Sequence, residues 1–189
     1  SGIYFPDEGQ IYIHGKPVTI ASPKDAFNLG IGMIHQHYKL VDVFTAAENI
    51  VLGLDEGGRL DIKAANAKVK EICDRYGFDI DPTQKIYDMS VSQKQTVEIV
   101  KVLYRGADIL ILDEPTRGVD VNAKFEIYSV INELAKAGIA VIMVSSELPE
   151  IINMCDNVCV IKAGKMTGML GREELDQERI MQYAAGGEE

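Results

Sequence analysis

The sequence predicts an α/β fold in which helices cover both faces of a mostly parallel β-sheet. Residues 109–112 and 139–144 are apolar throughout, as in strands that are buried on both faces. These runs alternate with segments whose apolar residues recur at helical spacing, which is the pattern of βαβ units. The chain has 189 residues, 47% of them hydrophobic and 25% charged, so it is large enough for one globular domain with its own core.

The first half of the chain contains turn, cap and stop signals. Residues 9–20 alternate apolar and polar side chains around a turn at 14–16, which predicts a β-hairpin. Thr45, with Glu48 three positions later, matches a capping box and marks a helix start. Gly77 ends a stretch with helical spacing. The predicted elements are the hairpin, a short strand within 28–36, and helices over 45–53, 62–76 and 91–106.

The second half changes from helical spacing to apolar runs. Ile127, Ile131 and Leu134 recur at helical spacing and predict the inward face of a helix. The predicted elements are a strand over 108–113, a helix over 122–137, a strand over 139–145, a short helix over 148–155, a hairpin over 157–170 and a final helix over about 176–184. No internal repeat and no low-complexity linker interrupts the sequence.

Composition excludes several classes of function. The 19 basic and 29 acidic residues give a formal charge of −10, which argues against a general nucleic-acid surface. The longest apolar run has six residues, whereas a membrane span needs roughly 20, so we expect no direct membrane insertion. The opening residues lack the basic and apolar regions of a signal peptide, and we expect the chain to start within a longer protein.

The three cysteines are Cys73, Cys155 and Cys159. An odd number without a secretory signal argues against a disulfide framework and for a reducing compartment. The spacing of Cys155 and Cys159 also allows a metal clamp, but no second pair of Cys or His follows it. Buried apolar thiols are therefore the preferred interpretation.

The acidic pair Asp113 and Glu114 ends the strand "ILILD". Ligands of open parallel sheets bind outside the carboxyl ends of the strands, so both carboxylates are candidate site residues. Asp113 would hold Mg²⁺ through water, and Glu114 would act as general base on a water that attacks a phosphate. The alternative is a strand that simply ends in solvated charges.

The stretch "MSVSQ" places Ser90 and Gln93 at the start of a helix. A helix N-terminus with a hydroxyl side chain is a phosphate site in many proteins, but an ordinary N-cap gives the same pattern. The strand with Asp113 and Glu114 about 20 residues later favours the phosphate interpretation.

Taken together, "MSVSQKQTVEIVKVLYRGADILILDEPT" resembles the signature helix and Walker B strand of an ATP-binding-cassette (ABC) transporter ATPase. The resemblance implies that Asp113 is the Mg²⁺-associated carboxylate and Glu114 the catalytic base. It implies that "RGVD", ending at Asp120, is the D-loop that faces a second cassette. It implies that Gln36 is the Q-loop glutamine, which contacts Mg²⁺ and the attacking water. The residues it assigns to ATP binding are Ser90, Ser92, Gln93, Asp120 and Ser146.

The resemblance implies a P-loop NTPase-like cassette core with a helical subdomain. One incomplete cassette would span 1–189, and its parts would be a helical and signature subdomain over about 40–106, a Walker B core over about 107–170, and a C-terminal helix and tail over 171–189. The strand and helix of the phosphate loop are missing. The nearest string, "GQIYIHGKP", has five residues between its glycines instead of four and ends in Pro17 where Ser or Thr is required, so we interpret it as a turn.

The stretch "SPKDAFNLGIGMIHQHYKL" is similar to importers of sugars and nucleosides that carry two cassettes in one polypeptide. Such a protein would work with a second cassette and a transmembrane permease, in the cytoplasm at the inner face of the membrane. Up to "ILDEPT" the chain resembles the first cassette, and from "RGVD" onward the second. This suggests a join near Leu112 to Thr116, produced by an internal deletion or an assembly artefact.

Two further departures from the family concern the nucleotide site: the first is expected to lower affinity across the dimer, and the second suggests a degenerate site. Ser92 stands where the signature motif has a glycine that lets the backbone approach a phosphate. Ser146 stands where the family has a switch histidine, and serine cannot become an imidazolium. Because the sheet also lacks a central strand and its helix, we expect an exposed apolar edge and face, and a chain that alone is poorly soluble or partly unfolded.

Three functions remain open. The chain is part of the ATPase subunit of an importer, with ATP and Mg²⁺ as its ligands, although alone it would be inactive without a phosphate loop. Alternatively, it is a non-catalytic module that docks on a permease or a partner cassette. A DNA-repair ATPase of the same superfamily is the third alternative, which the acidic charge and the lack of coiled-coil arms disfavour.

Overall fold

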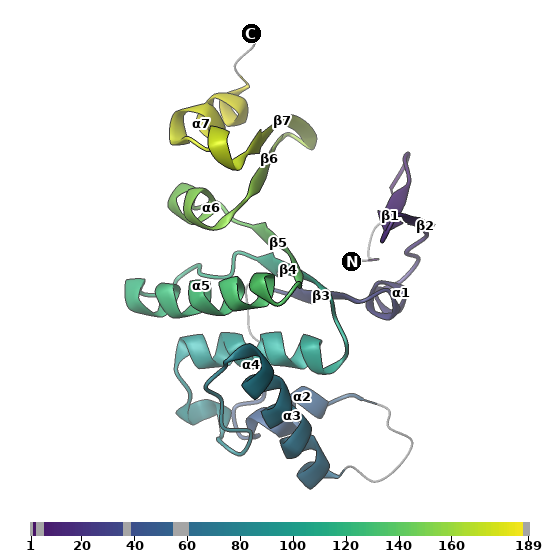
Figure 1. Cartoon of the computed structure of the whole chain (residues 1–189), viewed down its shortest axis with the longest axis vertical. Helices are drawn as coiled ribbons and strands as arrows, with labels where there is room; N and C mark the ends of the chain where they lie inside the picture. Colours follow the sequence, from purple (N-terminus) through teal and green to yellow (C-terminus); the bar gives the residue numbers. More distant parts are fainter. Residues whose placement is uncertain (1, 3–5, 36–38, 55–60, 187–189) are drawn as a thin grey trace. The chain divides into compact units, whose positions relative to one another are not determined.

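The computed structural model describes residues 2, 6–35, 39–54 and 61–186 of the chain (Figure 1). Gln36 lies outside the described residues. The chain separates into two compact units, Ser1–Val144 and Ser145–Glu189, each with its own set of helices and strands. The predicted division of a single cassette into three parts stays a prediction.

The first unit is built on a three-stranded parallel sheet. Its strands are β3 (Ile31–Ile34), β4 (Ile109–Asp113) and β5 (Ala140–Val144), in the order β3-β4-β5. All three strands are predicted from their apolar runs, and the α/β fold class is confirmed.

Only one face of this sheet is fully buried. On that face Leu110 and Leu112 are completely inaccessible, whereas Ile142 and Val144 on the opposite face are 53% and 51% exposed. The prediction of two covered faces is therefore wrong for the described residues. An apolar run shows that a strand can be covered on both sides, but covering it requires a helix on each side. The exposure of Ile142 and Val144 agrees instead with the expectation of an exposed apolar face.

Helices α4 (Val91–Tyr104) and α5 (Val121–Lys136) contact each other and the sheet: α4 contacts β3, and α5 contacts β5. Helix α4 approaches β3 very closely at Gly32, where an added Cβ would lie 2.9 Å from the side chain of Val102. A glycine at this position therefore allows the contact between helix and strand. The inward positions of α5, Ile127, Ile131 and Leu134, are buried as predicted.

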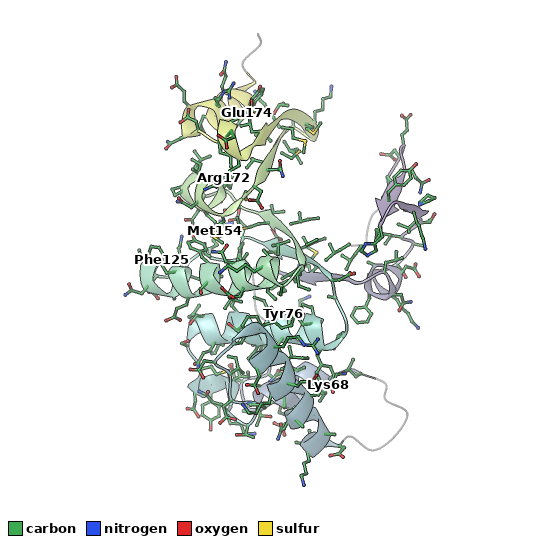
Figure 2. The ribbon with its side chains drawn as sticks, viewed as in Figure 1. Lys68, Tyr76, Phe125, Met154, Arg172 and Glu174 are labelled. Carbon is green, nitrogen blue, oxygen red and sulfur yellow. The ribbon has the colours of Figure 1, made fainter. Side chains whose placement is uncertain are left out.

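The helical part of the first unit consists of α2 (Ala46–Val51), α3 (Ile62–Tyr76) and α4, which contact one another. Helix α3 has the predicted bounds and ends at Gly77, whose φ of 72° is readily adopted only by glycine. Lys68 of α3, labelled in Figure 2, is in contact with α4. Its ammonium lies 3.9 Å from the centre of the Tyr104 ring.

The amino-terminal part of the first unit holds the predicted hairpin and one helix that is not predicted. Strands β1 (Ile11–Ile13) and β2 (Lys16–Val18) pair antiparallel across a two-residue turn in which His14 and Gly15 both have positive φ. Helix α1 (Pro23–Asn28) has Ser22 as its N-cap and a proline at its first position. These are recognisable start signals, but six residues are too few for helical periodicity to be visible.

The second unit contains α6 (Leu148–Met154), the antiparallel strands β6 (Asn157–Lys162) and β7 (Lys165–Gly171), and α7 (Gln177–Ala185). All four are predicted from the sequence. Their buried core consists of Val158, Val160, Leu170 and Ile180. Arg172, labelled in Figure 2, follows the end of β7. It donates to the carbonyls of Ile152 (2.6 Å) and Cys155 (3.1 Å) and so fixes the end of α6 to the end of β7.

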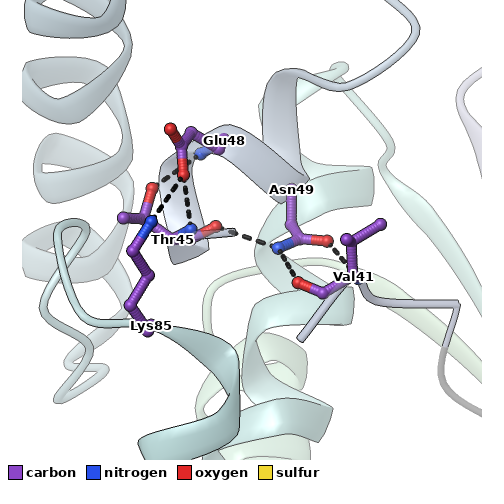
Figure 3. A network of polar contacts seen from close by, with 5 residues as sticks. All are labelled: Val41, Thr45, Glu48, Asn49 and Lys85. Atoms are coloured by element: carbon purple, nitrogen blue, oxygen red, sulfur yellow. Dashed lines mark hydrogen bonds and ion pairs between the residues drawn. The ribbon is translucent and has the colours of Figure 1, made fainter. Parts of the chain in front are cut away.

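The start of α2 is held by the predicted capping box (Figure 3). The Thr45 N–H donates to the Glu48 carboxylate at 2.6 Å, and the Glu48 N–H donates to the Thr45 hydroxyl at 3.2 Å. Lys85 reaches the same carboxylate at 3.4 Å. The hydrogen bond from the Thr45 N–H is the main cause that lowers the pKa of Glu48 below its ordinary value of 4.5. Burial raises this pKa, and the Thr45 hydroxyl and Lys85 lower it further.

We expect Glu48→Gln to remove a pH-dependent part of the stability of the first unit. A carboxyl group whose pKa is lowered by folding contributes stability above its unfolded pKa, and this contribution is lost as the pH falls through the folded value. The free energy of unfolding of wild type should therefore exceed that of the variant by about 0.5 kcal/mol at pH 7, a small value because the Glu48 side chain is partly exposed and screened. At pH 3 the two free energies should be equal. Thermal unfolding at both pH values measures the difference; Glu71→Gln on the exposed side of α3 is the control, and a difference that persists at pH 3 would contradict the assignment.

Candidate functional site

Asp113 is the last residue of the central strand β4, and Glu114 follows it directly. The N–H of Glu114 donates to the carbonyl of Val144 at 2.8 Å, so the ladder with β5 continues one residue past the strand. Both acidic side chains are partly exposed. The structure thus places the two predicted carboxylates together at the carboxyl end of the sheet, where open α/β sheets bind ligands.

Glu114 has a φ of 49°, which is uncommon for a residue other than glycine. Pro115 follows it, and a residue before proline is already restricted in the conformations it can adopt. The Arg117 N–H donates to the Glu114 carbonyl at 3.2 Å and closes a turn. Strained backbone of this kind is concentrated at functional sites, and here the surrounding turn and sheet hold the strained residue in place.

The donor chemistry at this edge fits Mg²⁺ that is bound together with a nucleotide. Mg²⁺ takes oxygen ligands, usually keeps several waters and is held by one or two carboxylates plus phosphate oxygens. Asp113 and Glu114 offer such oxygens. Among the described residues, no group of three or more His, Cys, Asp and Glu side chains gathers to form a metal cage. Asp113 would therefore hold the ion only with water and phosphates as further ligands.

The N-terminus of α4 carries the predicted phosphate-binding residues Ser90, Ser92 and Gln93. Ser90 and Gln93 form a capping box: the Gln93 N–H donates to the Ser90 hydroxyl at 3.2 Å, and the Ser90 N–H donates to the Gln93 side chain at 3.0 Å. These two side chains therefore have the ordinary capping role, which the sequence also allowed.

Ser92 is 5% exposed, and its hydroxyl lies 2.9 Å from the hydroxyl of Ser90. It donates a hydrogen bond to the carboxylate of Glu126 on α5. Glu126 is not predicted as a site residue, because it lies in the middle of a helix with nothing around it in the sequence that indicates a role. A cavity of about 380 Å³ adjoins these side chains and is also lined by Asp79 and Val130.

Asp120, predicted to lie in the D-loop, is the N-cap of α5. Its carboxylate accepts from the N–H groups of Asn122 and Ala123, each at 3.1 Å. Ser146 is exposed and belongs to the second unit, beside Ser145, whose hydroxyl donates to the buried Glu150. The roles of Asp120 and Ser146 toward a nucleotide stay predictions.

The segment that begins at Lys39 is anchored by a residue that the sequence analysis did not predict. Glu98 of α4, only 9% exposed, accepts from the N–H of Lys39 at 2.7 Å and lies 3.8 Å from the ammonium of Lys101. A second cavity, of about 230 Å³, lies here between β3 and α4. The only signal in the sequence is a charged residue on the apolar side of a helix, which indicates a buried partner.

The cysteines agree only partly with the expectation of buried thiols. Cys73 is buried, and this burial raises its pKa to about 11. Cys155 is partly buried, with a pKa also raised by burial, whereas Cys159 is exposed.

None of the helices within the described ranges is long and apolar enough to cross a membrane.

Residues 1–117, more than half of the chain, match the model of the family described as "ABC transporter". The nucleoside import ATP-binding protein NupA of Lactococcus lactis subsp. cremoris is 46% identical over 167 residues, covering 87% of this chain and 33% of NupA. The guanosine import ATP-binding protein NupO of Bacillus subtilis is 44% identical over 189 residues, covering 99% of this chain and 37% of NupO. The chain thus spans about a third of the length of these relatives.

The fold is similar to solved ATP-binding cassettes. One cassette of an ABC transporter in its ADP conformation is matched with a TM-score of 0.81 over 98% of this chain and 80% of that one, at 21% identity. A nucleotide-free cassette is matched with a TM-score of 0.76 over 96% of this chain and 76% of that one, also at 21% identity. At this level of identity the likeness concerns the fold alone.

Proposed function

This chain belongs to the ABC transporter family, and from that premise we propose that it is the ATP-binding part of an importer for sugars or nucleosides. In this proposal, ATP binding and hydrolysis by the cassette drive solute uptake through a membrane permease. The observation that carries the proposal is the pair of carboxylates at the end of β4, with Glu114 held at a φ of 49°.

The chemistry assigned to these residues is phosphoryl transfer to water. Mg²⁺, when bound with ATP, neutralises negative charge on the phosphates. Asp113 would hold the ion through its carboxylate, and Glu114 would accept a proton from the attacking water as general base. Gln36, Asp120 and Ser146 are proposed to contact the nucleotide, the water or the second cassette, on the strength of the family resemblance.

The proposed partners are a second cassette and a transmembrane permease, with the chain at the cytoplasmic face of the membrane. The matching proteins named as import ATP-binding proteins support this assignment. The second candidate function is a non-catalytic module that docks on the permease or on a partner cassette. The absence of a phosphate loop among the 189 residues favours this alternative for the chain by itself.

An equilibrium titration with Mg-ATP separates the two candidates. The chain is measured as it is and after a strand, phosphate loop and helix of the family type are joined to its N-terminus. We expect binding only in the joined chain, because the loop supplies the backbone N–H groups and the lysine that hold the phosphates. In the joined chain, Glu114→Gln should still bind ATP but hydrolyse it at least ~100-fold more slowly, since the general base is lost.

Glu133→Gln, an exposed charge change on α5, is the matched control and should change neither binding nor hydrolysis. Binding by the chain as it is would show that the nucleotide is held in another way. If the joined chain folds but binds no ATP, the non-catalytic module is the better description. If Glu114→Gln hydrolyses ATP at the wild-type rate, Glu114 is not the base.

A further inference from the structure

The middle of α4 contains one charged side chain between completely buried apolar ones. Val97 and Ile99 are inaccessible, and Glu98 between them is 9% exposed. We propose that Glu98 is a positioning residue for ATP hydrolysis: it holds the backbone at Lys39, and through the chain it sets the position of Gln36. This role rests on the proposed function, in which Gln36 contacts the attacking water.

The stability of α4 does not by itself account for a carboxylate at this position. Removing a carboxylate from water is costly, and a buried ion pair often stabilises a fold less than apolar side chains of similar size. The ammonium of Lys101, one turn further along the helix, lies 3.8 Å from the Glu98 carboxylate and offsets part of this cost. An apolar residue could pack here equally well, but it could not accept a hydrogen bond.

The hydrogen bond that Glu98 accepts joins segments 59 residues apart. The Lys39 N–H donates to Oε1 of Glu98 at 2.7 Å, whereas Lys101 faces the other oxygen, Oε2. A short bond to a charged acceptor is among the stronger hydrogen bonds in proteins. Of the described residues that line the adjoining cavity, only Glu98 has a carboxylate. No other carboxylate of this lining therefore competes for the Lys39 N–H.

In the sequence, Gln36 lies between two fixed points of the backbone. Ile34, the last residue of β3, is 4% exposed and pairs with β4. Lys39 is held by Glu98 of α4. Gln36 follows the first point by two residues and precedes the second by three, so the length of chain limits where its side chain can reach. Loss of the second point would release one end of this span.

The expected effect of losing Glu98 is on the rate of hydrolysis and not on the binding of ATP. A residue that orients the attacking water acts in the transition state, and a displacement of about 1 Å costs up to ~100-fold in rate. ATP itself would be held mainly by the phosphate loop of the joined chain. Loss of Glu98 should therefore lower kcat and leave KM for ATP nearly unchanged.

The first test measures the anchor without nucleotide. Hydrogen exchange of the Lys39 amide is compared between the 189-residue chain and its Glu98→Ala variant. We expect exchange at least ~10-fold faster in the variant, because the N–H loses a charged acceptor. Glu98→Gln keeps an oxygen acceptor and should show an intermediate rate. Ile99→Val, which removes one buried methylene at the next position but no hydrogen bond, is the control and should exchange at Lys39 like wild type.

The second test measures ATP hydrolysis by the joined chain. Glu98→Ala should lower kcat about 10- to 100-fold while KM for ATP stays within about twofold of wild type. Glu98→Gln should recover part of the lost kcat, since it can still accept from the Lys39 N–H. Ile99→Val should leave kcat and KM unchanged, because it weakens the packing of α4 without releasing the backbone at Lys39.

The outcomes separate this role from a merely structural one. Equal exchange of the Lys39 amide in wild type and Glu98→Ala would overturn the proposal, because the anchor would then be absent in solution. An active joined chain whose kcat is unaffected by Glu98→Ala, or equally lowered by Ile99→Val, would also overturn it. A wild-type joined chain that hydrolyses no ATP rejects the proposed function instead, and the exchange of Lys39 still decides whether Glu98 holds the backbone.

Discussion

Leu112→Ala is expected to destabilise the first unit by about 4 kcal/mol. Leu112 is completely buried on the covered face of β4, and removing three carbon atoms there leaves a cavity that α4 and α5 can fill only in part. The loss is read as faster native-state hydrogen exchange of the amides of α4 and α5. This measurement reports local stability even where the chain does not unfold in one step.

Ile142→Ala is the matched control on the neighbouring strand. Ile142 is 53% exposed on the opposite face. Its truncation should therefore change the free energy of opening, as measured by exchange of the same amides, by less than about 1 kcal/mol. Similar losses for both variants would mean that the second face of the sheet is covered in solution. A small loss for Leu112→Ala would mean that α4 and α5 do not pack on the first face.

Asn49→Ala is expected to cost about 2–3 kcal/mol in the helical part of the first unit. Asn49 is completely buried; its side-chain carbonyl accepts from the Val41 N–H at 2.7 Å, and its amide donates to the carbonyls of Val41 (3.1 Å) and Thr45 (3.0 Å) (Figure 3). Alanine removes all three bonds and leaves a cavity where a completely buried side chain lay, and the exposed loop 41–44 loses its attachment to α2. Hydrogen exchange of the α2 amides measures the effect.

Asn66→Ala is the contrasting variant. The side-chain oxygen of Asn66 is buried without a hydrogen-bond partner in the structure, and the residue lies within α3, where alanine has the higher helix propensity. We expect this variant to be neutral or slightly stabilising. If Asn49→Ala and Asn66→Ala destabilise the protein equally, the network around Asn49 does not have the stabilising role inferred from its hydrogen bonds.

Much of the fold was predictable because its signals are local. Glycines with positive φ ended helices at Gly77 and Gly106, and the Thr45–Glu48 capping box is present as predicted. The coverage of the sheet was not predictable, since the apolar sequence of β5 is the same whether or not a helix lies on each of its faces. Helix α1 was missed because its start signals precede only six residues.

The candidate site was predictable only where the chain itself brings residues together. Asp113 and Glu114 are neighbours in sequence, and a strand end places both at one edge. Glu126 meets Ser92 from a position 34 residues away, and Glu98 meets Lys39 from 59 residues away. Partners at such separations depend on how helices pack, which residue spacing does not encode. Gln36 lies outside the described residues, and its predicted role stays a prediction.

The anchors of the segment 39–41 have a consequence for sequence variation. Glu98 holds Lys39 through its backbone N–H, and Asn49 holds Val41 through its backbone N–H and carbonyl. Because every residue except proline carries these groups, homologues can exchange the side chains at 39 and 41 without losing the attachment. The evolutionary constraint then falls on Glu98 and Asn49, which lie on helices away from the loop that they hold.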